Sequence, residues 1–246
     1  PDVSTLHARA LAHVSAEPFE NLDPWLGRPV SLSPDAIVAK LVDGGRGGYC
    51  FEQNGLLLDV LDQLGFRVQP LSARVRLQRP REFVPARTHL FVRVELADGP
   101  WALDVGVGGL SCTAALRLVP DVVQPTPHEP RRFVVEGGRW FHQALLGDTW
   151  SDVCEFTGEE MPPIDREVAN WFTSTYPGSN FRTRLSAARA TRDGGRWTLV
   201  DRQLTRRAPA SEPEVSRIED EPHLRRVLTD TFGLAVPDGP VPMPPG

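Results

Sequence analysis

The sequence predicts an α+β protein with three consecutive regions: a helical bundle (residues 1–65), an antiparallel β region (66–160) and a mixed α/β region (161–246). Apolar residues recur at helical spacing up to Gly65, whereas short alternating runs bounded by Gly and Pro follow Phe66. Helical patterns return in the last region, where they flank a hairpin. The residues alone leave open whether the β region is a barrel or a sandwich.

Two helices are expected before the Gly-rich turn of the first region. One covers residues 1–17, and the other covers 33–45. The second begins at Ser33, an N-cap type of residue, followed by Pro34 at the first helical position. The apolar residues at helical spacing in the first helix are Leu6, Ala10 and Val14.

A third helix is expected from about Cys50 to Leu64, with Gly65 as its C-terminal stop. The β runs that follow are LSARVRL, THLFVRVEL, WALDVGV, RRFVVEGGRWFHQAL and SDVCEF. In the last region we expect a helix and turn over 161–181, a hairpin around residues 193–195 and a helix that ends at Gly233. The tail after it is expected to be extended and loosely held.

Composition excludes several classes of protein. The net charge is -5 with acidic and basic residues intermixed, which argues against a dedicated nucleic-acid surface. No apolar run is long enough to span a membrane, and no signal segment is visible. The chain begins at Pro1 without a Met, which leaves a trimmed N-terminus open.

The three cysteines are widely spaced and include no C-x-x-C pair. This pattern is neither a disulfide framework nor a zinc site, and we expect no metal. A reducing cytoplasm fits best. Cys112 and Cys154 are expected to be structural, which leaves Cys50 to explain.

Cys50 follows the glycine-rich turn RGGY and opens a predicted helix. A helix N-terminus stabilises a thiolate through free N–H groups and the helix dipole. The same N–H groups are available to a developing oxyanion. Gly47 and Gly48 would let a substrate approach closely. The alternative is a buried structural cysteine, and the position alone leaves both open.

A nucleophilic thiol needs a base, and the base needs an orienting group. His89 opens one β run, and Asp104 lies in the next, where a carboxylate among apolar residues requires a partner. A tight turn at Asp98 and Gly99 would pair Val92 with Val105 and place His89 and Asp104 on the other face, four residues out of register. Arg93 would then face Asp104, so a plain ion pair competes with the triad unless the strand bends near Gly106 or Gly108.

These residues belong to a wider pattern that resembles the arylamine N-acetyltransferase family. In the family's order, the chain carries PFENLD (18–23), KLV (40–42), RGGYCFEQNG (46–55), THLFV (88–92), LDVGVGG (103–109) and NWFTSTYPGSNF (170–181). The resemblance implies a helical bundle, an antiparallel β-barrel and an α/β lid around a triad like that of cysteine proteases. It assigns the triad to Cys50, His89 and Asp104. The substrate pocket that we expect is lined by Phe19, Tyr49, Phe51, Gly106, Val107 and Gly108.

The chemistry implied by the resemblance is acyl transfer from a thioester such as acetyl-CoA to an aryl amine or hydrazine, through an acyl-cysteine. Acetyl-CoA is a substrate here, and no bound cofactor is expected. The partners expected are these small molecules, without nucleic acid or membrane. The acceptor amine and the oligomeric state stay undetermined.

Two features depart from the family pattern. Relatives usually carry some twenty more residues before the first helix, and they have a phenylalanine where this chain has Val107. A smaller residue near the acyl site implies a roomier pocket. This favours, as an alternative, an amide synthase that releases an ansamycin-type polyketide from a carrier protein. A cysteine hydrolase or transglutaminase-like enzyme is a more distant alternative, because the same triad serves those reactions.

Overall fold

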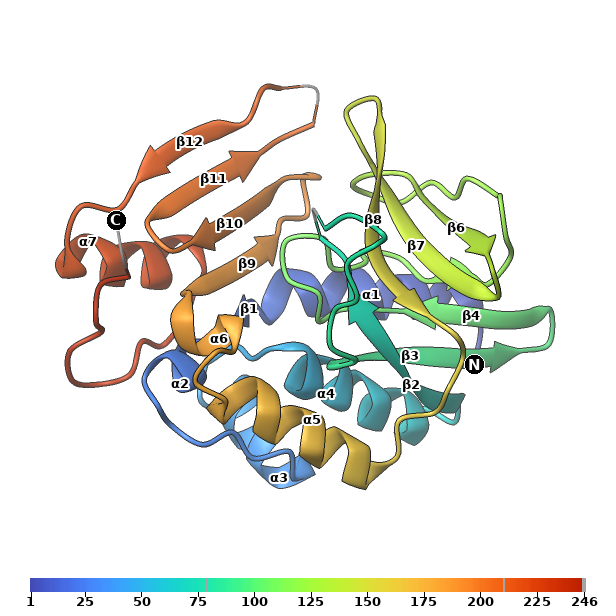
Figure 1. The fold of residues 1–246 in the computed structure, drawn as a ribbon, viewed down its shortest axis with the longest axis horizontal. Helices are drawn as coiled ribbons and strands as arrows, with labels where there is room; N and C mark the ends of the chain where they lie inside the picture. Colours follow the sequence, from blue (N-terminus) through green and yellow to red (C-terminus); the bar gives the residue numbers. More distant parts are fainter. Residues whose placement is uncertain (78, 210, 245–246) are drawn as a thin grey trace.

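The computed structural model describes residues 1–77, 79–209 and 211–244 (Figure 1). Its helices are α1 (Val3–Ala16), α2 (Leu22–Trp25), α3 (Pro34–Val38), α4 (Cys50–Gln63), α5 (Pro163–Thr175), α6 (Asn180–Thr183) and α7 (Glu221–Arg226). The π-helical turns η1 (Ala39–Asp43) and η2 (Val227–Thr231) continue α3 and α7. The strands are β1 (Phe19–Glu20), β2 (Arg67–Val75), β3 (His89–Leu96), β4 (Gly99–Leu103), β5 (Leu116–Arg117), β6 (Arg131–Glu136), β7 (Arg139–Leu146), β8 (Thr149–Phe156), β9 (Ser186–Ala190), β10 (Arg196–Val200), β11 (Gln203–Arg207) and β12 (Glu214–Arg217).

The β region forms a seven-stranded antiparallel sheet in the order β5-β4-β3-β2-β8-β7-β6. Its two edges approach one another, because the segment after β5 bridges β6 at the pairs Pro120–Phe133 and Gln124–Arg131. The sheet is therefore a nearly closed barrel. The predicted α+β class is confirmed, and tertiary pairing decides the choice between barrel and sandwich.

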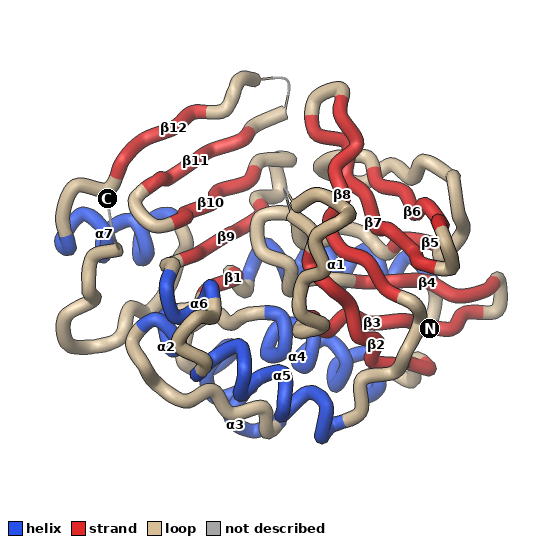
Figure 2. The backbone as a smooth tube through the Cα atoms, in the orientation of Figure 1, coloured by secondary structure: helices blue, strands red, loops and turns tan. Residues whose placement is uncertain are grey.

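A second antiparallel sheet has the order β1-β9-β10-β11-β12. Strand β1 lies early in the chain and pairs with β9 through Phe19 and Ala188. Helix α7 covers this sheet, and its buried Leu224 packs with Leu199 and Leu204 of the strands (Figure 2). The N-terminal helices and the C-terminal sheet are thus joined by backbone hydrogen bonds as well as by packing.

Helix α4 packs against the barrel strands β2 and β3 (Figure 1). Its Leu57 and Leu61 are buried in the largest apolar cluster, together with Leu90 and Leu103 of the barrel. Full burial of one leucine side chain contributes about 1.5–3 kcal/mol. This packing fixes the axis of α4, and with it the position of Cys50 at its first turn.

Several local predictions are confirmed. Ser33 caps α3, with its hydroxyl accepting a hydrogen bond from the N–H of Ala36 at 3.3 Å. Helix α4 ends at Gln63, one residue before the predicted end at Leu64 and two before the predicted stop at Gly65. The expectation of a loosely held tail is wrong: Val241 is buried, and Trp25 donates to the carbonyl of Pro242 at 3.0 Å. The sequence hid this because an isolated valine among prolines gives no periodic signal.

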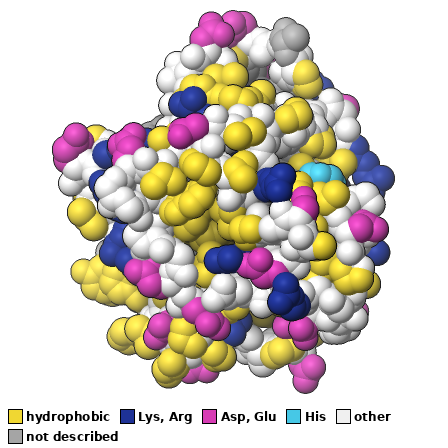
Figure 3. Space-filling model, turned by 90° about the vertical axis from the view of Figure 1, so that its right-hand side faces the viewer, with side chains coloured by type: hydrophobic (Ala, Val, Ile, Leu, Met, Phe, Trp, Pro, Cys, Tyr) yellow, Lys and Arg dark blue, Asp and Glu magenta, His cyan; other side chains and the backbone are white. Residues whose placement is uncertain are grey.

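Two further features concern the side chains on the surface and the lengths of the helices. On the face shown in Figure 3, acidic, basic and hydrophobic side chains are interspersed. Within the described ranges, no helix combines the length and apolarity needed to cross a membrane.

Candidate active site

The first turn of α4 is built on close backbone packing. A Cβ at Gly47 would lie 2.0 Å from the carbonyl oxygen of Pro18, so only glycine fits at that position. Glu52 accepts a hydrogen bond from the N–H of Tyr49 at 3.1 Å and pairs with Lys40 at 2.6 Å. The glycine turn and this buried ion pair fix the point where the helix begins. Cys50 occupies its first position and is only 4% exposed.

The predicted register of the β3–β4 hairpin is wrong by two residues. Val92 pairs with Leu103, where the sequence predicted Val105, and Leu96 pairs with Gly99. Strand β4 therefore ends at Leu103, and the predicted continuation through Val107 is a loop. Asp104 leaves the ladder at this point and turns toward His89.

Arg93 does not form the competing ion pair with Asp104. Arg93 pairs with Ala102 across the hairpin and donates to Glu95 at 2.6 Å. Asp104 instead accepts a hydrogen bond from His89, with 2.7 Å between Nε2 and Oδ2. The predicted Arg93–Asp104 alternative is wrong because it depended on the incorrect register.

His89 and Asp104 are both buried, at 1% and 3% exposure. Burial by itself would lower the pKa of His89, but the charge and hydrogen bond of Asp104, together with interaction with the Cys50 thiol, raise it to about 10. Burial would raise the pKa of Asp104, yet His89 and Asn54 hold it below its usual value. At neutral pH the ring is an imidazolium. Its Nε2 is committed to Asp104, which leaves Nδ1 for the thiol. Cys50 Sγ lies 3.7 Å from the carbonyl oxygen of Thr88, the neighbour of His89.

Asn54, one turn after Cys50, connects all three segments of this site. Its amide nitrogen donates to Leu90 O at 2.6 Å and to Asp104 Oδ1 at 3.0 Å. Its oxygen accepts from the N–H of Val105 at 3.0 Å. Asn54 was not among the site residues predicted from the sequence. The available signal was its i+4 spacing from Cys50, which places both side chains on one helix face.

We expect Asn54→Leu to destabilise the protein by at least about 3 kcal/mol, because several buried groups would lose a partner at about 1–3 kcal/mol each. Urea unfolding monitored by circular dichroism measures the change. Gln63→Ala, at an exposed position of the same helix, is the control and should stay within about 0.5 kcal/mol of wild type. Equal stability of Asn54→Leu and the control would contradict this role.

Asp104 also depends on close packing of its own loop against α4. The N–H of Gly106 donates to Asp104 Oδ1 at 3.1 Å. A Cβ at Gly106 would lie 2.6 Å from the Cα of Cys50, so glycine is required for this approach. The loop thereby brings Asp104 and Cys50 into one site.

The expected pocket residues fall into two groups. Phe19, Tyr49 and Phe51 lie in the apolar cluster that includes Cys50, and Tyr49 packs edge-on against Phe51 with ring centroids 5.7 Å apart. Val107 lies in a separate cluster between the loop and barrel strands β7 and β8. Gly108 contacts the ring of Phe19: a Cβ there would lie 3.5 Å from it.

The remaining two cysteines are buried inside the barrel. Burial raises the pKa of Cys112 to about 11 and that of Cys154 well above its usual value. They flank His142, with sulfur–nitrogen distances of 3.9 and 4.0 Å. Across the part of the chain that is described, His, Cys, Asp and Glu side chains form no group of three placed to hold a metal ion.

Both the sequence and the fold of this chain match those of known proteins. A family model described as N-acetyltransferase matches residues 2–240. An arylamine N-acetyltransferase of Mycolicibacterium smegmatis is 43% identical over 97% of this chain and 87% of the relative.

Two solved structures also match this chain over nearly its whole length. The Mycobacterium tuberculosis arylamine N-acetyltransferase superposes with a TM-score of 0.92 at 41% identity, covering 96% of this chain and 88% of the other. The Mycobacterium marinum enzyme in complex with CoA gives 0.91 at 40% identity, covering 95% and 87%. The sequence match spans nearly the whole chain, and the folds superpose over the same length. The chain therefore belongs to the arylamine N-acetyltransferase family.

Proposed function

We propose that this protein transfers an acetyl group from acetyl-CoA to the nitrogen of an aryl amine or hydrazine through an acyl-Cys50 intermediate. The observation that carries the proposal is the buried His89–Asp104 pair beside a cysteine at a helix N-terminus. The names of its relatives and the CoA complex of one of them support the same reaction. Acetyl-CoA and reduced thiols occur together in the cytoplasm, which we propose as its compartment.

In the first half-reaction, the Cys50 thiolate attacks the thioester carbonyl carbon. The carbonyl oxygen becomes an oxyanion, which the N–H groups of Cys50 and Phe51 stabilise, because those of Glu52 and Gln53 already donate to the carbonyl of Tyr49. The tetrahedral intermediate collapses, the carbon–sulfur bond to CoA breaks, and the imidazolium of His89 protonates the departing thiolate. Acetyl-Cys50 and neutral His89 remain.

In the second half-reaction, the amine nitrogen attacks the acetyl-Cys50 carbonyl. Neutral His89 accepts the proton that the nitrogen loses, and the Cys50 thiolate leaves as the amide forms. This regenerates the thiolate–imidazolium pair. Asp104 holds Nε2 of His89 throughout, which keeps Nδ1 directed at the reacting sulfur.

The test is incubation of the purified protein with acetyl-CoA and a simple aryl amine. We expect CoA thiol and the acetylated amine in equal amounts, and acetyl-protein by intact mass when the amine is omitted. Thioester hydrolysis without amide product would favour a hydrolase, and no reaction of either kind would overturn the proposal.

The amide-synthase alternative draws on one feature, Val107. The relatives named above are called arylamine N-acetyltransferases, and none of their names mentions a carrier protein. The whole-length match likewise favours transfer to an amine over a hydrolase or transglutaminase-like reaction. The length of the acyl chain that the protein accepts therefore tests the amide-synthase alternative.

We expect Val107→Phe to narrow the range of acyl donors. Val107 follows Asp104 by three residues, and its buried side chain packs with Leu110, Ala144 and Val153. If the space around it holds longer acyl chains, phenylalanine would exclude propionyl and longer thioesters by roughly 10–200-fold in relative kcat/KM. A donor series of increasing length on wild type, Val107→Leu and Val107→Phe measures this. Identical profiles for the three proteins would remove the basis of the amide-synthase alternative.

A further inference from the structure

The loop that carries Asp104 and Val107 is held at its far end by three guanidinium groups. Arg207 donates to the carbonyl of Gly109 at 3.0 Å, Arg131 to that of Leu110 at 2.8 Å, and Arg196 to that of Ser111 at 2.9 Å. These are three consecutive carbonyls. We call the three arginines, together with Glu129, the arginine clamp.

Glu129 joins two members of the clamp. Its carboxylate accepts hydrogen bonds from Arg196 at 2.8 and 3.0 Å, and it also pairs with Arg131. Burial would raise the pKa of Glu129, but the two arginines lower it to about 2, so it stays ionised. Arg131 and Arg196 are 1% and 4% exposed. A buried charge is costly unless its hydrogen-bond partners are in place. The loop carbonyls are among the partners of these two guanidinium groups.

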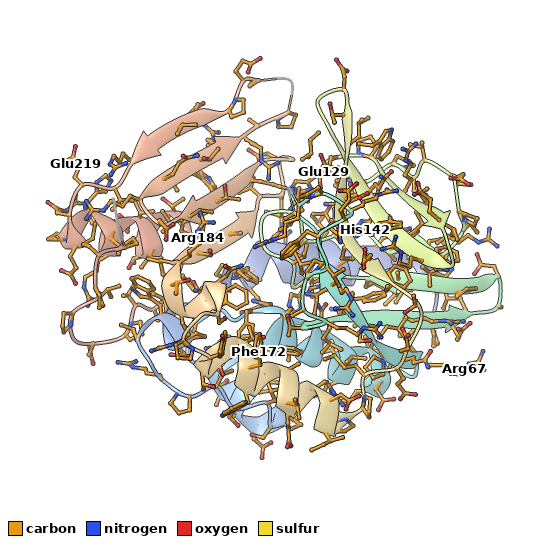
Figure 4. The ribbon with its side chains drawn as sticks, viewed as in Figure 1. Arg67, Glu129, His142, Phe172, Arg184 and Glu219 are labelled. Atoms are coloured by element: carbon orange, nitrogen blue, oxygen red, sulfur yellow. The ribbon has the colours of Figure 1, made fainter. Side chains whose placement is uncertain are left out.

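The clamp joins separate parts of the fold. Arg131 opens β6 of the barrel, whereas Arg196 and Arg207 belong to β10 and β11 of the second sheet. Figure 4 shows the labelled Glu129 where the barrel side and the second sheet approach each other, near the labelled His142. The active-site loop is thus fixed from both sheets at once.

Two contacts transmit this constraint to Asp104. The N–H of Cys112 donates to the carbonyl of Asp104 at 2.6 Å, which closes the loop on itself. Arg131 also lies 3.3 Å from Nε2 of His142, and His142, Cys112 and Asp104 line one small internal cavity. Displacement of residues 109–111 would therefore displace Asp104.

The loop needs such support because of its composition. Residues 104–109 are DVGVGG, so half of this stretch is glycine, which has the greatest backbone freedom to lose. Its own hydrogen bonds to Asn54 fix only the beginning of the loop. Charge-assisted hydrogen bonds to three successive carbonyls fix its end.

We propose that the arginine clamp is a positioning device for the acyl-transfer reaction: it holds the loop so that Asp104 orients His89 toward Cys50. The inference rests on the proposed function for its catalytic consequence. Its structural consequence, the coupling between Glu129 and the protonation of His89, is independent of which substrate is used.

Glu129→Gln tests the proposal. We expect kcat/KM to fall by about 100-fold, as for a displacement of about 1 Å in a catalytic group. We also expect the pKa of His89, followed by NMR of ¹⁵N-labelled histidine, to fall by about one unit as its contact with Asp104 loosens. The matched control is Glu155→Gln. Glu155 is buried, whereas Glu129 is half-buried, and Glu155 likewise pairs with arginines, here Arg74, Arg76 and Arg139 of the barrel.

Arg207→Met is the second variant, because Arg207 is only half-buried and its loss threatens folding less than that of Glu129. We expect a smaller loss in the same direction. Wild-type values of the His89 pKa in both variants, or an equal decrease in Glu155→Gln, would overturn the proposal. If wild type acetylates no amine, the proposed function fails, but the His89 titration still decides for or against the clamp.

Discussion

Replacement of Cys50 by alanine is expected to abolish acyl transfer while leaving the fold intact. The sulfur forms the covalent intermediate, and removal of the nucleophile from other catalytic triads costs on the order of 10⁵-fold or more in kcat. Cys50 lies at a helix start whose position is fixed by Glu52 and the packing of α4, so loss of one sulfur atom should change stability little. Turnover with acetyl-CoA and an aryl amine, together with thermal unfolding, measures both.

A chemical readout accompanies this prediction. Stoichiometric iodoacetamide should modify Cys50, because this thiol lies at the start of a helix and interacts with His89. Cys112 and Cys154 should react slowly, since burial raises the pKa of both thiols. Cys154→Ala serves as the control and should keep its turnover per folded molecule. Labelling spread evenly over the three cysteines would contradict the assignment of the nucleophile.

Asp104→Asn is expected to lower kcat by about 10⁴-fold, as in other triads where an amide replaces the orienting carboxylate. Asparagine would keep the shape but lose the charge that raises the pKa of His89 to about 10. The ring would then be free to adopt the tautomer that directs the wrong nitrogen at Cys50. Steady-state kinetics at neutral pH measures the loss.

Arg93→Ala is the control for Asp104→Asn. Arg93 pairs with Glu95 on a partly exposed strand face, a type of ion pair worth about 0–1 kcal/mol. Turnover should therefore stay at the wild-type level. Comparable losses of activity in Arg93→Ala and Asp104→Asn would instead support the Arg93–Asp104 ion pair, which the observed register excludes.

The same pair predicts a pH dependence of stability. The pKa of His89 is about 10 in the folded protein and about 6.5 in an unfolded chain. The stabilisation from its protonation is fully present below pH 6.5 and is lost as the pH rises through 10. Asp104→Asn should flatten this decrease. Urea unfolding of both proteins between pH 6 and 10 provides the comparison, and parallel curves would argue against the coupling.

Local signals in the sequence determined several helices and strands of this protein and part of its candidate active site. The glycine turn and apolar spacing predicted α4 with Cys50 at its start, because capping and periodicity act within a few residues. The alternation of the middle region predicted antiparallel strands, and a carboxylate among apolar residues predicted that Asp104 had a buried partner. The motifs resembled a family, and the whole-chain comparisons confirmed it.

Only the tertiary structure decided the features that depend on contacts between distant segments of the chain. The hairpin register could not be obtained from the turn, because a shift of two residues keeps the same faces inside, so the apolar pattern does not distinguish the two registers. The end of β4 at Leu103 follows from contacts with Asn54 and with the start of α4. Likewise, no local pattern indicates that arginines of two sheets hold the carbonyls of one loop. Each of these features is a contact between residues far apart in sequence, and its free energy exists only once the core has brought them together.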